Sequence, residues 1–79
     1  MNDTLREDLC GLLSERGEMT ISQMIAEVFP DTDNYERDRS RVYQALTWLH
    51  KWGYVEKSKR YPGEELRWWY VRGGHRLRL

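Results

Sequence analysis

The feature that most restricts the fold of this chain is an abrupt change of pattern at Gly53. Before it, apolar residues recur at helical spacing along one side of the stretch 35–52. These residues are Val42, Ala45, Leu46 and Leu49. Trp48 and Trp52 fall at the margin of this stripe, where we expect them to help seal the core. After Gly53, two runs rich in β-branched and aromatic residues, YVEKSKRY and LRWWYVR, flank the turn PGEE. The pattern predicts a helix over 35–52 that leads directly into a two-stranded hairpin over 54–72.

Two capping boxes predict earlier helices. A T-x-x-E box begins at Thr4 and a T-x-x-Q box begins at Thr20, and apolar residues at helical spacing follow each of them. Pro30 prevents the second helix from continuing, because proline lacks an N–H and clashes with the preceding turn. The sequence predicts helices over 4–16 and 21–29, with a short strand immediately before the second one.

Length and composition limit the class of protein. The chain has 79 residues, so we expect one domain over residues 1–79. A single cysteine, Cys10, excludes an internal disulfide and a zinc site made of cysteines. The sequence contains no apolar run of about 18 residues, so it predicts no membrane span. Residues 1–20 lack the pattern of a signal peptide. The default expectation is a soluble cytoplasmic protein.

The charges are divided along the chain. Residues 1–36 carry nine acidic and two basic residues, a net charge of −7, whereas residues 37–79 carry eleven basic and four acidic residues, a net charge of +7. Such asymmetry between halves is a hint of a surface that binds a polyanion. The alternative is that the two halves attract each other within the fold.

The stretch 42–57, VYQALTWLHKWGYVEK, resembles the winged helix-turn-helix transcription regulators, and the PadR-like group most closely. TISQMIAEVF resembles their second helix, and WYVRGG resembles the second wing strand and its exit. The resemblance implies an α+β fold, with three helices followed by a two-stranded wing and a tail over 73–79. It also implies a small transcriptional regulator that binds double-stranded DNA, with the third helix in the major groove and the wing on the backbone. Winged helices also serve in protein interactions, so the fold alone does not decide the function.

The outward face of the predicted third helix carries the DNA-contacting residues in this interpretation, with Ser40, Tyr43 and Thr47 as donors to phosphates or base edges. The candidates are Arg37, Ser40, Arg41, Tyr43, Gln44 and Thr47. Arginine bonds guanine O6 and N7 with two donors and glutamine pairs with adenine, so Arg37 or Arg41 and Gln44 are expected to select bases. Two alternatives remain open. Arg39 and Arg41 could pair with acids of the first two helices, or the whole face could be only solvated.

The wing is expected to contact the DNA backbone. Its candidate residues are Lys57, Lys59, Arg60 and Arg67. Phosphate contacts of this kind supply affinity and salt dependence rather than sequence choice. The predicted register places Arg67 across from Lys59, where it extends the basic patch. The alternative is that the wing lysines only protect an edge strand from pairing with another chain.

The hairpin register also decides which tryptophan faces the core. Placing Val55 opposite Val71 turns Trp69 inward and leaves Trp68 and Tyr70 facing outward. Neighbouring exposed aromatic residues are typical of an interface, so this surface predicts a protein partner or a homodimer contact. The alternative function is therefore a winged-helix protein-interaction module, which uses this surface or the acidic first two helices.

Nothing in the sequence predicts an enzyme. His50 and His75 are far from each other and from Cys10 in the sequence, and no serine lies near a histidine and aspartate arrangement. The segment RGGH lacks the spacing and the lysine of a phosphate-binding loop. The acidic run before the third helix lacks the glycine and the final glutamate of a calcium loop. We therefore expect no cofactor, no metal ion and no small-molecule substrate.

Overall fold

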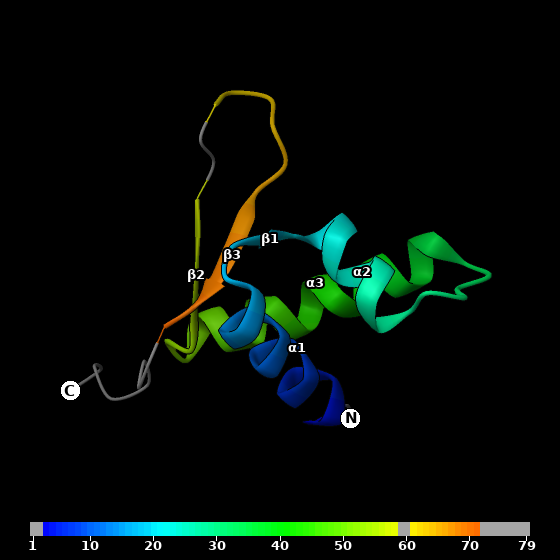
Figure 1. Cartoon of the computed structure of the whole chain (residues 1–79), viewed down its shortest axis with the longest axis horizontal. Helices are drawn as coiled ribbons and strands as arrows, with labels where there is room; N and C mark the ends of the chain where they lie inside the picture. The colour runs from blue at the N-terminus through cyan, green and yellow to red at the C-terminus, as the bar shows by residue number, and fades with distance from the viewer. Residues whose placement is uncertain (1–2, 59–60, 72–79) are drawn as a thin grey trace.

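The computed structural model describes residues 3–58 and 61–71. Its helices are α1 (Asp3–Arg16), α2 (Ile21–Val28) and α3 (Tyr35–Lys51), and its strands are β1 (Met19–Thr20), β2 (Val55–Ser58) and β3 (Arg67–Tyr70). The predicted α+β class, the short strand before the second helix and the hairpin after the third are confirmed (Figure 1). Each helix boundary lies within one residue of its predicted position. The predicted tail over 73–79 lies outside the described residues.

Local capping explains where the helices begin and end. The predicted box at Thr20 is present: its hydroxyl accepts from the backbone N–H of Gln23, and its own N–H donates to the Gln23 side chain at 3.0 Å. Thr4, by contrast, lies within α1 rather than before it. The side chain of Asn34 caps α3. Gly53 follows α3 with a φ of 81°, a conformation that favours glycine.

The three strands form one antiparallel sheet in the order β1-β3-β2. Val55 pairs with Tyr70, and Trp68 lies between Lys57 on one side and Met19 on the other. The predicted register, with Val55 opposite Val71, is therefore wrong by one residue. Because side chains alternate between the faces of a strand, this slip exchanges the inward and outward residues. Trp68 faces the core and is 0% exposed, so its predicted outward orientation is wrong.

One apolar core joins the helices to one face of the sheet. Leu9 and Leu13 of α1, Met24 of α2 and Leu46 of α3 are buried with Trp68, which is the largest fully buried side chain. Burial of apolar surface of this kind is the main favourable contribution to folding. Within the described ranges, no helix is long and apolar enough to cross a membrane.

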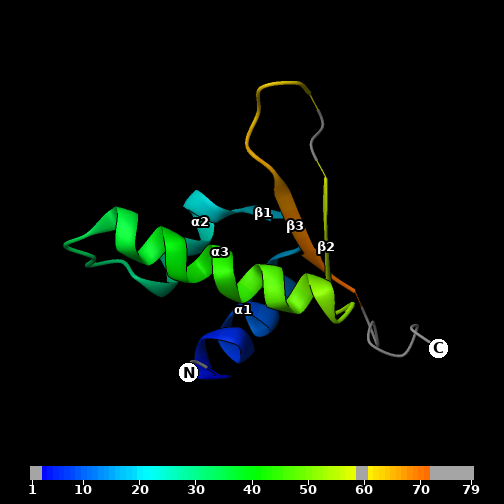
Figure 2. The same cartoon turned by 180° about the vertical axis from the view of Figure 1, so that it is seen from behind.

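The arrangement leaves one long side of α3 open. Figure 2 shows α3 across the near side of the molecule, with α1 and α2 behind it and the β2–β3 hairpin rising beside its C-terminal end. The outward side of α3 and the base of the hairpin therefore belong to the same surface.

Candidate nucleic-acid interface

The outward side of α3 is polar and accessible. All six residues predicted on this side are exposed: Arg37, Ser40, Arg41, Tyr43, Gln44 and Thr47. Ser40, Gln44 and Thr47 form its central stripe, because they are spaced by four and three residues and lie opposite the buried Val42 and Leu49. This stripe can present hydroxyl and amide groups to a ligand.

Asp38 is the residue that the sequence reading missed. Its side chain lies at the inward side of α3 and is 1% exposed, the only buried charged residue among those described. It accepts hydrogen bonds from the Thr32 hydroxyl, from Arg37 Nε at 3.1 Å and from Arg41 Nη1 at 3.3 Å. A signal was available, because Asp38 precedes Val42 by four residues and so belongs to the apolar stripe. The hydrogen bond from Arg37, and then that from Thr32, lowers the pKa of Asp38 below its ordinary value.

These contacts change what the two arginines can do. Arg37 also donates from Nη2 to Asp33 at 3.1 Å, and the Arg41 guanidinium lies 5.0 Å from the Phe29 ring centre. The hydrogen bond with Asp38 raises the pKa of Arg37, so its charge is fixed but balanced. The beginning of α3 is therefore an ion-pair cluster rather than a patch of unpaired positive charge.

The alternative pairing considered for Arg39 and Arg41 is not what the structure contains. Arg41 pairs with an acid of its own helix instead of one from α1 or α2. Arg39 is exposed and makes no ion pair with another residue of the described ranges.

The wing residues have different surroundings. Lys57 is exposed, and its ammonium nitrogen lies 5.3 Å from the Trp68 ring centre. Arg67 is half-buried, pairs across the sheet with Ser58, and has its Nε 3.6 Å from a Glu64 carboxylate oxygen. The prediction that Arg67 lies across from Lys59 is therefore wrong, again because of the one-residue slip in register. Lys59 and Arg60 lie outside the described residues.

Trp68 links the helix to the wing. The rings of Tyr43 and His50 lie nearly perpendicular to its ring, with centroid distances of 6.5 and 6.4 Å, and Lys57 lies over the same ring. Residues from α3 and β2 thus share one buried aromatic support. The structure thus brings Tyr43 and His50 of α3 and the exposed Lys57 of β2 to one ring.

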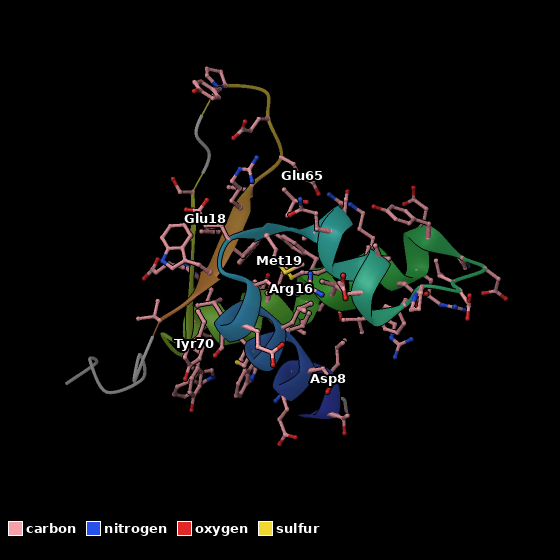
Figure 3. All side chains as sticks on the ribbon, viewed as in Figure 1. Asp8, Arg16, Glu18, Met19, Glu65 and Tyr70 are labelled. Carbon is pink, nitrogen blue, oxygen red and sulfur yellow. The ribbon has the colours of Figure 1, made fainter. Side chains whose placement is uncertain are left out.

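A second contact holds the hairpin loop against α2. The carboxylate of Glu65 accepts from the backbone N–H of Ser22 and from the Ser22 hydroxyl, both at 3.1 Å, and Figure 3 shows Glu65 beside the start of α2. The Ser22 hydroxyl also meets the Tyr35 hydroxyl of α3 at 3.2 Å. A negative charge is favourable at a helix N-terminus, so Glu65 stabilises this position of the loop.

The predicted aromatic interface does not form as expected. Trp68 is fully buried and Tyr70 is half-buried, so they do not make an exposed pair. Instead Trp48 and Trp52, which were expected to seal the core, are 38% and 50% exposed. The Trp48 ring lies parallel to that of Tyr54 with centroids 6.3 Å apart. We call Trp48, Trp52 and Tyr54 the aromatic patch.

Comparisons with known proteins do not add to this description, since no protein-family model, curated protein or solved structure matches the chain. Across residues 3–58 and 61–71, no three histidine, cysteine or carboxylate side chains are grouped in a way that could hold a metal ion. The chemistry of the surface of α3 and the wing is thus that of hydroxyl, amide, aromatic and cationic groups.

Proposed function

We propose that this chain is a winged helix-turn-helix domain that binds double-stranded DNA, with α3 in the major groove and the base of the wing against the backbone. The observation that carries the proposal is the exposed polar stripe of α3, a helix whose Tyr43 meets the same Trp68 ring as Lys57 of the hairpin. An α-helix is narrow enough to enter the major groove, which is about 12 Å wide.

The ion pairs at the start of α3 limit the electrostatic part of the binding. Arg39, Lys51 and Lys57 are the exposed cations of α3 and β2 that make no ion pair within the described residues. Three phosphate contacts give a slope of log affinity against log salt of about −2.7, which corresponds to an approximately fortyfold loss between about 50 and 200 mM salt. We expect a moderate, salt-sensitive affinity.

The test is fluorescence anisotropy with a labelled duplex of mixed sequence at those two salt concentrations. The variant Arg39→Ala should weaken binding and reduce the salt slope by about 1. Its matched control is Arg16→Ala, because Arg16 is also an exposed arginine but pairs with Glu27 on the α1–α2 side of the molecule. Absence of duplex binding at low salt, or an equal effect of the two variants, would contradict the proposal.

The aromatic patch supports a second candidate function, that of a protein-interaction module. Two exposed tryptophans in one cluster are unusual on a surface that binds nothing and are typical of an interface. Trp48 follows Gln44 by one turn, whereas Trp52 is the C-cap residue of α3, five residues beyond Thr47, so a change at Trp52 tests the patch separately from the stripe. If the chain is an interaction module, it should not bind duplex DNA, and Trp52→Ala should abolish capture of the partner. If the chain is a DNA-binding domain, Trp52→Ala should leave its affinity for duplex DNA unchanged.

A further inference from the structure

We infer that the base pairs beneath Ser40, Gln44 and Thr47 of α3 are A·T pairs, because these side chains of the central stripe can recognise adenine and thymine. Lys51, one turn after Thr47 on the same side, can bond guanine or phosphate and lies beyond these three pairs. The inference rests on the proposed function and names the class of DNA sequence that the same surface selects.

The arginines expected to read guanine are already bonded to carboxylates within the protein. Arginine recognises guanine with two donors of one guanidinium group. In Arg37, Nε and Nη2 are already bonded to Asp38 and Asp33, and in Arg41, Nη1 is bonded to Asp38. Removing these donors from Asp38 would leave a carboxylate that is 1% exposed without its charged partners, which is unfavourable. The ion pairs therefore occupy the Nε and Nη2 donors of Arg37, and the contacts with Asp38 and Phe29 hold the Arg41 guanidinium beside the end of α2.

Arg39 lies off-centre. It follows the buried Asp38 by one residue, so it projects about 100° from the buried side, whereas the central stripe projects from the opposite side. A long cationic side chain on the flank of a groove-bound helix meets the phosphates at the edge of the groove. Arg39 thus contributes affinity rather than base selection.

The central stripe offers groups that match A·T pairs. The Gln44 amide combines a donor and an acceptor, as adenine N7 and N6 require, and the methyl group of Thr47 can contact the methyl group of thymine. The Ser40 hydroxyl can bond either base. The stripe rises about 10 Å from Ser40 to Thr47, which corresponds to roughly three stacked base pairs at 3.4 Å each.

Glu36 lies one turn before Ser40 on the same side of α3 and is exposed. Its carboxylate can accept from the cytosine amino group, as glutamate does in major-groove recognition. The A·T preference therefore applies to the pairs beneath Ser40, Gln44 and Thr47, and not to the pair that flanks them.

The first experiment selects bound duplexes from a random-sequence pool with the full chain, followed by affinity measurements on the selected site. We expect roughly three adjacent A·T pairs. Replacing thymine by uracil in that site removes only the C5 methyl group and should weaken binding about fourfold for each methyl group in contact. Gln44→Ala should lower the preference for adenine at one position by about fivefold or more.

Two substitutions at one position provide the matched control. Thr47→Val keeps the methyl group and removes the hydroxyl, so it should retain the discrimination between thymine and uracil. Thr47→Ser keeps the hydroxyl and removes the methyl group, so it should lose that discrimination. Both changes are small and exposed, so both variants should fold.

The outcomes distinguish failure of the A·T preference from failure of DNA binding. Duplex binding with no A·T preference, or a selected site whose guanines depend on Arg37 or Arg41, overturns this inference and leaves the proposed function standing. Failure to bind any duplex at low salt overturns both. An A·T-rich site with equal affinity for thymine and uracil, in the wild type and in both Thr47 variants, also overturns the inference.

Discussion

The two ends of α3 carry similar numbers of polar side chains but use them differently. In the segment 37–41, two arginines bond to Asp38, so their charges are balanced within the protein. In the segment 43–51, Gln44, Thr47 and Lys51 are exposed and make no ion pair with a described residue. We call these the closed segment and the open segment.

The two segments show that the charge counted along a helix in the sequence differs from the unpaired charge that the helix presents to a ligand. The second half of the chain has a net charge of +7, yet Arg39 is the one cation of the closed segment that makes no ion pair with a described residue. The open segment adds one exposed lysine, Lys51. A ligand that approaches α3 meets donors and acceptors rather than a strong positive field, which favours recognition by shape and hydrogen bonding.

The largest effect is expected from removing the support of the open segment. Trp68→Ala should lower the free energy of unfolding by about 3–5 kcal/mol, because it leaves a large cavity beneath Tyr43, His50 and Lys57. Urea unfolding followed by circular dichroism measures this change. Trp52→Ala is the control and should cost less than about 1 kcal/mol, since Trp52 is 50% exposed.

A second variant at the same position separates packing from polarity. Trp68 Nε1 is buried and has no hydrogen-bond partner in the described part of the chain. Trp68→Phe should therefore cost clearly less than Trp68→Ala, because it keeps an aromatic ring and removes an N–H that makes no bond. Equal losses for the two variants would show that Trp68 does not act as the aromatic support of the wing.

The next largest effect is expected from breaking the closed segment. Asp38→Asn should lower the melting temperature, because a neutral amide cannot balance Arg37 and Arg41 and also leaves one of its own N–H groups near them. Asp33→Asn is the matched control: Asp33 also pairs with Arg37, but its side chain is 86% exposed, so the change should be small. Similar melting temperatures for the two variants would mean that burial of Asp38 is unimportant.

The pH dependence of stability gives a finer test of the same cluster. The pKa of Asp38 is lowered in the folded protein from its ordinary value of 3.8, mainly by the hydrogen bond from Arg37. A lowered folded pKa contributes stability that is fully present above the unfolded pKa and is lost as the pH falls through the folded pKa. The difference in melting temperature between the wild type and Asp38→Asn should therefore be constant near neutral pH and shrink below about pH 4. A difference that stays constant down to pH 2 would argue against this ion pair.

Local sequence signals predicted the elements well. The box at Thr20, the break at Pro30 and the glycine at position 53 act within a few residues, so helix ends could be placed within one residue. The hairpin register could not be predicted this way. It depends on β1, which is far away in the sequence and pairs Met19 with Trp68. One residue of error was enough to exchange the faces of the hairpin.

The candidate site also has a part that local spacing predicts and a part that depends on residues outside α3. Helical spacing alone predicted which residues of α3 are exposed, because it depends only on the period of the helix. The ion pairs of the closed segment depend on the connector before α3, since the Thr32 hydroxyl holds Asp38 from outside the helix. Spacing placed Asp38 with the apolar stripe, but an acid in that position was not expected to be buried. The pairing of Arg37 and Arg41 with Asp38 was therefore not predicted.

The smallest effect is expected at the contact that holds the wing loop. Glu65→Gln removes the charge at the start of α2 and should lower the free energy of unfolding by about 0.3–1 kcal/mol at low salt, with less effect at high salt. Ser22→Ala removes the hydroxyl that the same carboxylate accepts from, and the double variant measures whether the two losses are coupled. Glu15→Gln in α1 is the control, as an exposed glutamate far from the loop. Additive losses, or an equal loss in the control, would mean that Glu65 does not tie the hairpin to α2. A coupled loss would mean that the hairpin beside the open segment is positioned by the contact of Glu65 with the start of α2 as well as by Trp68.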